Sequence, residues 1–598
     1  MAEQPTPQQS LELQRINWAA CLPFLKLFGT FRLAIQPGKL GLALAAVLLT
    51  MLWGGFLDGL WSARCQPPAG EVHAFWQKAD IASWRQAAQD AWPMVLTRAC
   101  QPLGIRLSPE LKQRLREDPE GQFEDVLERI RKAAATDLKE LAERLEKDGK
   151  KPDEIRSAVA QRAGSFADSY TMVEAVAPRG VFRSFMEYES AVGRQLLNAA
   201  ITLNFTEGLT EVLTARASPV PAVAALGGLG SEGMIRVDGG SRGMGVLSCA
   251  VLAARGKQWL LSEHFWFAIL WGLPVLAVWA LFGGAICRMA ALNIARDERP
   301  SPKSVLRFAQ RKLASFFVAP LLPLVLILLP GVVLFLGGLL ASVPYLGDLG
   351  GGILAILALA GGLLIAVVII GGSAGASLMW PTIAVEGSDG FDAVSRGYSY
   401  VFARPWRAAF YAGVLTVYGA ICYLFVRFCV LLGLMAARFF VGAGMGLTDR
   451  PGTGLAEAGK IDVLWPAPTW EELQPGRLPI GVEGWDSAAG FLLGIWLAVV
   501  IALLCAFAAS FFLSGSTMVY CLLRREVDAT DYEEVFLEED GEQGEADLPF
   551  DESGSAAAAL PDSEGSGVVA PRDDSGAEPA RPADGDMPST GEGRTNAE

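Results

Sequence analysis

The sequence is short of charge and of histidine. Of its 598 residues only 19% are charged, and its two histidines are His73 and His264. So few histidines exclude a mechanism that depends on a histidine cluster or a histidine-rich metal site. Nine cysteines spread over this length do not form a disulfide framework. Soluble domains carry about a quarter charged residues, so a chain that is 52% hydrophobic, with a mean hydropathy of +0.32, is not an ordinary soluble protein.

Charge is entirely missing from six stretches of the sequence. These stretches are 40–57, 265–287, 313–347, 349–385, 408–426 and 487–523. Each is long enough, or very nearly, for a helix that crosses the ~30 Å hydrocarbon core of a bilayer, which needs roughly 17–25 residues. The sequence therefore predicts a protein that crosses a membrane several times.

We predict an all-α fold, a polytopic membrane bundle of six transmembrane helices with a mostly helical extracytoplasmic domain and a disordered acidic C-terminal tail. The expected segments are a cytoplasmic N-terminal segment 1–39, a transmembrane helix 40–61, an extracytoplasmic domain 62–258 with a flexible Gly/Pro-rich end, a membrane domain 259–523 and a tail 524–598. Within the membrane domain, helices are expected near 265–287, 314–342, 351–379, 408–432 and 488–522. Arg427 leaves open whether one helix or two cover 408–447.

The negative charge of the chain is concentrated at its C-terminal end. Residues 524–598 hold 22 acidic and 5 basic residues, a net charge of −17, so the rest of the chain carries +3 of the total of −14. Beyond about Asp540 the tail is rich in Gly, Ala, Ser, Pro and acid, a composition that cannot bury enough apolar surface to fold. We predict a disordered, cytoplasmic acidic tail.

Positive residues in short connectors indicate the orientation, because they favour the cytoplasmic side of a membrane. Arginine and lysine gather in 1–39, in 288–312 and at Arg524–Arg525. This distribution predicts that both termini are cytoplasmic. Three cysteines, Cys65, Cys100 and Cys249, would then lie on the outer side, where a disulfide between two of them remains open.

The segment 62–258 carries helix signals. Ser108-Pro109-Glu110 is typical of a helix start, with a capping side chain, proline at the first position and an early acid. Apolar residues at spacings of three and four between Phe123 and Leu145 predict an amphipathic helix, and a second helix is expected from Pro152 to about Phe166. The hairpin they form either packs its apolar stripe internally or binds a partner as a coiled coil.

The two basic connectors of the membrane domain place cations beside aromatic rings, which suits the lipid headgroup region. The candidate residues for membrane anchoring or lipid-headgroup binding are Arg288, Arg296, Arg307, Arg311, Lys312, Arg396, Arg404, Trp406 and Arg407. They either only anchor and orient the helices or bind anionic lipids specifically.

A further set of residues lies within the apolar runs. The Gly371-x-x-x-Gly375 spacing allows two helix backbones to approach closely. Ser373 and Arg427 could instead line a cavity at membrane depth, because polar groups inside a membrane usually face the interior of the protein. These four residues are the candidates for helix packing or for a cavity.

The stretch Tyr520 to Arg525, followed by acidic residues, and the amphipathic turn from Arg396 to Arg407 also carry a resemblance. In these motifs the chain resembles uncharacterised bacterial polytopic membrane proteins and, more distantly, the membrane domain found beside some glycerophosphodiester phosphodiesterases. The similarity covers roughly 285–317 and 370–537. It implies a membrane-domain fold without enzymatic activity, since the histidines and clustered acids of the phosphodiesterase domain are absent. The two connectors also indicate a weak duplication of two helical hairpins.

We expect a multi-pass protein of a bacterial cytoplasmic membrane with a non-enzymatic role, either membrane organisation or scaffolding of partners or lipids. A transporter with a cavity between the two hairpins is the alternative, and a membrane enzyme acting on lipids is the third. The expected partners are the bilayer, with anionic lipids, and a protein bound through 62–258 or through the acidic tail. No cofactor, catalytic residue, metal ligand or nucleic-acid partner is predicted.

Overall fold

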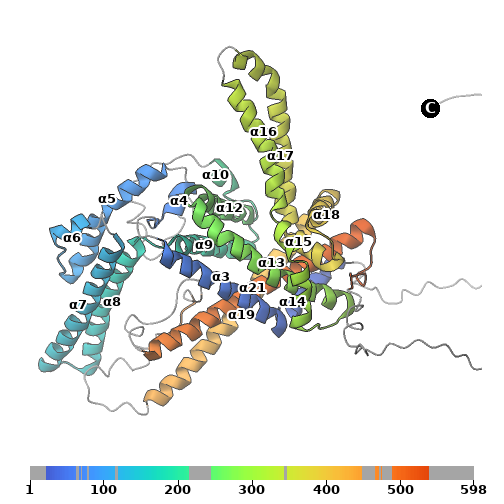
Figure 1. The fold of residues 1–598 in the computed structure, drawn as a ribbon. Coiled ribbons are helices and arrows are strands. Elements are labelled where there is room, and N and C mark those ends of the chain that lie inside the picture. Colours follow the sequence, from blue (N-terminus) through green and yellow to red (C-terminus); the bar gives the residue numbers. More distant parts are fainter. Residues whose placement is uncertain are drawn as a thin grey trace, which may run out of the picture. The chain divides into compact units, whose positions relative to one another are not determined.

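The computed structural model describes residues 22–61, 66–68, 70–76, 80–114, 119–214, 244–342, 346–446, 465, 467–470, 473 and 488–537. Every regular element in these ranges is a helix (Figure 1). Six of the helices are long and apolar enough to span a membrane. A helix suits hydrocarbon because it satisfies its backbone N–H and C=O groups internally. The prediction of an all-α fold with six helices long and apolar enough to span a membrane is confirmed for this part of the chain.

The six apolar helices are α3 (Pro37–Leu60), α13 (Phe265–Arg296), α16 (Leu322–Ala341), α17 (Leu346–Glu386), α19 (Pro405–Gly446) and α21 (Ala488–Asp528). Five of the six extend beyond at least one end of their uncharged stretches, whereas α16 is shorter than the stretch 313–347. The open question about 408–447 is settled within the described residues, because α19 is one continuous helix through Arg427 up to Gly446.

The helix expected at 314–342 is interrupted, which corrects the prediction. A short helix, α15 (Leu313–Val318), ends before residues 319–321, and α16 begins at Leu322. Pro320 lies in this break and Pro323 lies in the first turn of α16, where its missing N–H leaves no helical hydrogen bond unmade. Pro330, by contrast, lies inside α16.

A short amphipathic helix follows each of two apolar helices. After α13 comes α14 (Pro302–Arg311), whose first turn is capped by the Ser301 hydroxyl. After α17 comes α18 (Gly390–Ala403), whose first turn is capped by the Asp389 carboxylate, 2.8 Å from the amide of Asp392. Each cap accepts an N–H that the helix cannot pair. Each short helix thus leads into the next part of the membrane domain.

The core of the bundle is built around α3, α13, α17 and α21. Helix α3 packs against both α13 and α21, and α13 packs against α17. A second apolar cluster joins α21 to α19, to the 3-10 helix η1 (Pro23–Gly29) and to α2 (Thr30–Ala34). By contrast, α16 buries no residue and packs mainly along α17, beside which it runs in Figure 1. Its apolar side chains therefore face outward, as expected of a helix surrounded by lipid.

The segment between α3 and α13 forms two apolar cores. Its helices are α4 (Glu71–Trp76), α5 (Ile81–Cys100), η3 (Gln101–Leu103), α6 (Pro109–Arg114), α7 (Pro119–Lys147), α8 (Pro152–Val176), α9 (Val181–Ile201), α10 (Leu209–Thr214) and α12 (Val246–Glu263). One core contains only residues of 74–177. The other joins α9 and α12 to Leu57 of α3 and Phe267 of α13. The expected boundary at residue 61 is therefore not a boundary in packing.

The helix signals of this segment are confirmed in the structure. The Leu111 amide donates to the Ser108 hydroxyl at 3.2 Å, so α6 starts where the sequence indicates. Helices α7 and α8 pack together as a hairpin around the turn at Asp148-Gly149, where Gly149 has a φ of +69°. Helix α8 continues to Val176, beyond the expected end near Phe166.

The expected tail differs near its start. Helix α21 continues through Arg524 to Asp528, and residues up to Leu537 are described. A disordered segment beginning at residue 524 is thus wrong for 524–537, because these residues have defined protein partners. Residues 538–598 lie outside the described residues, as do 1–21 of the N-terminal segment and 215–243 of the Gly/Pro-rich end.

Two of the three cysteines expected on the outer side are free thiols. Cys100 and Cys249 are buried and not in a disulfide, while Cys65 lies outside the described residues. Burial raises the pKa of both thiols, that of Cys249 to about 11. Because the thiolate is the reactive form, both cysteines act as small apolar residues at neutral pH.

Candidate functional site

The most highly connected polar cluster of the bundle lies where α17 and α21 end, together with η1, α14 and α18. We call this the basic end. Its centre is Glu386, the last residue of α17, whose side chain is only 9% exposed. Its carboxylate forms ion pairs with Arg396 at 2.8 Å and with Arg524 at 3.2 Å, and it accepts a hydrogen bond from the Tyr520 hydroxyl. One acid thus connects α17, α18 and α21.

Two further acids on α21 repeat this arrangement. Glu526 pairs with Arg407 at 2.7 Å and accepts a hydrogen bond from the Tyr411 hydroxyl, so that α21 is joined to the start of α19. Asp528 accepts the Tyr400 hydroxyl of α18. Burial, followed by the hydrogen bond to Asp528, raises the pKa of Tyr400 to about 12, so its hydroxyl remains a donor at neutral pH.

Arg288 lies inside the protein, which corrects its assignment as a lipid-headgroup residue. It is 5% exposed, and its guanidinium donates to the carbonyls of Ala384 at 2.8 Å and Phe536 at 2.5 Å. The guanidinium carbon also lies 4.4 Å from the ring centre of Phe308. The reason is geometric. The planar guanidinium of Arg288 carries several N–H donors, so from its position two turns before the end of α13 it can reach both carbonyls at once.

The segment after α21 is held against the basic end. The Phe536 amide donates to the Val385 carbonyl at 2.9 Å, and its ring lies against Gly387, where an added Cβ would come within 2.6 Å of it. Arg524 donates to the Glu534 carbonyl at 2.6 Å. The Tyr532 ring lies 3.3 Å from the Lys26 ammonium. Residues 531–537, which we call the terminal strap, therefore contact α17, α21 and η1.

The other predicted anchoring residues lie at the surface of the basic end. Arg307 and Arg311 are exposed on α14, opposite its buried Val305 and Phe308. Lys312 is half-buried and donates to the Gly387 carbonyl at 2.5 Å. Three more predicted anchoring residues are exposed. Arg296 lies 3.9 Å from Glu298, Arg404 is at the surface, and Trp406 is 86% exposed.

Gly371 and Gly375 lie where α17 meets α18. A Cβ on Gly371 would come within 2.4 Å of the Tyr398 ring, and one on Gly375 within 3.3 Å of the Gly397 backbone. The small residues thus allow two helix backbones to approach closely. Ser373 is exposed on the same helix, and its hydroxyl donates to the Ile369 carbonyl one turn earlier.

Arg427 lies far from that contact along the chain and has other neighbours. It is 4% exposed, donates to the Trp470 carbonyl and lies 4.3 Å from the Trp470 ring centre. On the same helix, Arg438 donates to the Trp465 carbonyl at 2.8 Å. The structure therefore gives Arg427 and Ser373 separate surroundings, and Arg427 and Arg438 of α19 contact Trp470 and Trp465.

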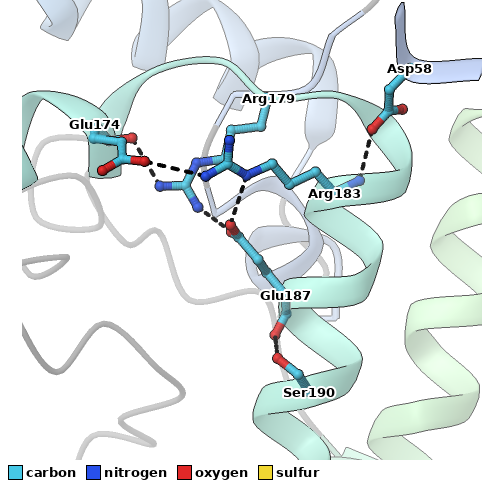
Figure 2. Close-up of polar contacts among 6 residues, drawn as sticks. All are labelled: Asp58, Glu174, Arg179, Arg183, Glu187 and Ser190. Atoms are coloured by element: carbon cyan, nitrogen blue, oxygen red, sulfur yellow. Dashed lines mark hydrogen bonds and ion pairs between the residues drawn. The ribbon is translucent and has the colours of Figure 1, made fainter. Parts of the chain in front are cut away.

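A second polar cluster lies where α3 meets α9, at the opposite end of α3 from the basic end (Figure 2). Asp58, in the last turn of α3, accepts the backbone amides of Phe182 and Arg183, each at 2.9 Å. The side chains of Arg179 and Arg183 both reach Glu187. An acid at a helix start is favourable because it accepts unpaired amides and meets the positive end of the helix dipole.

A third cluster surrounds Glu71, which is 1% exposed. Its carboxylate accepts hydrogen bonds from Nη2 and Nε of Arg85 at 2.6 and 2.7 Å and from the Trp259 indole N–H at 3.0 Å. The carboxylate also lies 3.6 Å from the His264 ring. Burial favours a higher pKa for this carboxyl, but the bonds from Arg85 and His264 outweigh it and hold the pKa below its usual value. The ionised acid connects α4, α5 and α12.

Glu386, Asp58 and Glu71 are absent from the sequence-based set of site residues. Glu386 and Asp58 had a usable signal, because each is the first acid after a long uncharged stretch, and carboxylates so placed tend to pair. Glu71 had none. Among the described residues no group of His, Cys, Asp and Glu could hold a metal ion.

Comparison with known proteins adds no relative: no protein-family model, no curated protein and no solved structure matches this chain.

Proposed function

We propose that this protein is a non-enzymatic membrane scaffold that binds anionic lipid headgroups at its basic end and carries a helical domain at the other membrane face. The basic end would face the cytoplasm, since its connectors are rich in arginine and lysine. Both described termini, at η1 and at the terminal strap, would then be cytoplasmic. The segment with α4 to α12 would lie outside, where it could present its surface to a protein partner.

The observation that carries this proposal is the division of the cations at the basic end into two sets. Arg288, Arg396 and Arg524 pair with acids or carbonyls of the protein itself. Arg307 and Arg404 are exposed, and Trp406, two residues after Arg404 in the chain, is 86% exposed. Exposed guanidinium groups and an exposed indole fit the headgroup layer, where the ring lies in the interface and the cation meets phosphate.

Scaffolding accounts for the remaining geometry better than transport does. The Ser373 hydroxyl forms a hydrogen bond within its own helix, and Arg427 packs on Trp470. The two candidate cavity residues therefore do not line a common cavity. Glu386 and Glu526 join α17, α18, α19 and α21 through short ion pairs. Connections of this kind favour a rigid bundle rather than two halves that move against each other.

Lipid analysis of the purified protein tests the proposal. A triple variant, Arg307→Gln, Arg404→Gln and Trp406→Ala, is purified in mild detergent from a membrane containing anionic lipid, and the bound lipids are quantified by mass spectrometry. We expect the anionic fraction to fall severalfold relative to the zwitterionic lipids. The control is Arg98→Gln, an exposed arginine on α5 that would lie at the opposite membrane face. An unchanged anionic fraction in a folded triple variant would refute headgroup binding at this surface.

A further inference from the structure

Lys39 is a buried cation within a membrane-spanning helix. It is the third residue of α3 and is 0% exposed, which places it among the largest fully buried side chains of the protein. Its amino group has no hydrogen-bond partner among the residues that the structure describes. Burying a charge without a partner is costly, and ionisable groups inside membrane proteins are rare and usually functional. The group therefore requires an explanation that its sequence position, beside the membrane boundary, does not provide.

The surroundings of Lys39 are a seam where three helices meet. Helices α3, α13 and α21 pack pairwise. Cys287 on α13, which is itself 0% exposed, lies close enough to Lys39 to affect it electrostatically. Cys287 in turn contacts α21, because its sulfur lies 4.0 Å from the Leu513 carbonyl.

The face of α21 that enters this seam carries hydroxyl groups. Ser510, Ser514 and Thr517 are spaced by four and three residues, so they share one side of the helix. Ser510 donates to the Ala34 carbonyl at 2.9 Å, and Thr517 donates to the Leu513 carbonyl at 2.8 Å. Ser514, between them, is 0% exposed, and within the described part of the chain its hydroxyl has no hydrogen-bond partner.

The seam therefore presents donors without an acidic partner. The ammonium of Lys39 and the hydroxyl of Ser514 can each donate a hydrogen bond, and no carboxylate of the described residues accepts one from Lys39. We propose that this seam binds a small inorganic anion of the halide class, held by the ammonium of Lys39 and the hydroxyl of Ser514. A monatomic anion suits the position because Lys39, Cys287 and Ser514 are all completely buried, which leaves little room for a larger group.

Halide-dependent stability tests the proposal on the whole protein in detergent. A ligand that binds only the folded state raises its stability by mass action. The thermal midpoint is measured in sodium chloride or bromide and in sodium gluconate at equal ionic strength, and binding of radioactive chloride is measured by equilibrium dialysis. We expect the wild type to be more stable in halide and to bind about one chloride per chain.

Three variants separate the anion site from general salt effects. Lys39→Met, which keeps the length of the side chain, should abolish chloride binding and make the midpoint independent of the anion. Ser514→Ala keeps the charge and should weaken chloride binding about tenfold, the loss expected when a hydrogen bond to a charged group is removed. Lys303→Met, an exposed lysine on α14, should bind chloride like the wild type.

The outcomes decide the proposal even if Lys39→Met does not fold, because Ser514→Ala and the wild type remain informative. A wild-type midpoint that is equal in chloride and gluconate, together with no bound chloride, overturns the site and leaves Lys39 as a neutral or hydrated amine. Chloride binding that Ser514→Ala leaves unchanged overturns the assignment of Ser514. The result is independent of the lipid analysis, which concerns residues exposed at the surface.

Discussion

The carboxylate of Asp58 accepts a hydrogen bond from the backbone amide of Phe182 at 2.9 Å, although 124 residues separate them in the chain. This bond fixes the start of α9 to the end of the first membrane-spanning helix. It also means that the segment between α3 and α13 is held to the bundle by an N-terminal cap supplied from another helix. The relationship leads to the first prediction.

Replacing Asp58 by alanine should destabilise the protein by about 1–2 kcal/mol, the usual effect of losing an N-cap. Asp58→Asn should lose less stability, because the side-chain amide oxygen can still accept a hydrogen bond from one backbone N–H. Chemical unfolding followed by tryptophan fluorescence measures the difference. Asp125→Asn, in an exposed ion pair with Arg129 on α7, is the control and should change stability by less than about 0.5 kcal/mol. Equal effects of Asp58→Ala and the control would contradict the capping role.

Replacing Gly387 by alanine should release the terminal strap. Gly387 has a φ of +65°, which costs a non-glycine residue roughly 1–2 kcal/mol, and a Cβ there would lie 2.6 Å from the Phe536 ring. We expect faster proteolytic cleavage after Asp528, with the bundle itself intact. Gly433→Ala is the matched control, since an added Cβ on that glycine of α19 meets nothing within 4 Å. Cleavage rates that are the same in both variants would exclude a strap held by this contact.

Replacing Glu71 by glutamine should lower the free energy of unfolding at neutral pH and make that free energy less dependent on pH in the acid range. The loss should be about 3 kcal/mol, because Arg85 and Trp259 lose a buried charged acceptor. The folded pKa of Glu71 is lowered, so this carboxyl stabilises the fold above its unfolded pKa of about 4.5 and loses that effect as the pH falls through the folded value. The variant should therefore show a smaller fall in unfolding free energy between neutral and acid pH.

Glu128→Gln provides the control for this measurement. Glu128 is an exposed acid on α7 that forms an ion pair with Lys132 one turn away, so its removal should leave the slope of stability against pH nearly unchanged. If Glu71→Gln keeps the wild-type slope, the buried acid does not titrate in the way that its partners indicate.

The fold class could be predicted because local composition decides it. A stretch of about twenty uncharged apolar residues has few alternatives to a membrane-spanning helix, and the cap at Ser108 works within one turn. The ends of the helices were harder to predict from the sequence. Charged residues such as Arg524 continue α21 because their partners, Glu386 and the Glu534 carbonyl, come from elsewhere in the chain.

The candidate site was predicted only at the level of residue types. Arg288 and Arg307 belong to one basic connector, yet one is 5% exposed and the other is at the surface. Their difference depends on Ala384 and Phe536, which pack against α13 from 96 and 248 residues away. No local pattern contains that information.

By itself, then, the sequence determined the number and place of the apolar helices, since each follows from a continuous run of residues, and it determined that the acid is concentrated in the tail. Only the tertiary structure decided which charges are neutralised inside the protein and which remain at its surface. Lys39 shows why: its sequence position resembles that of any lysine at a membrane boundary, and its burial arises from the packing of α13 and α21 around α3.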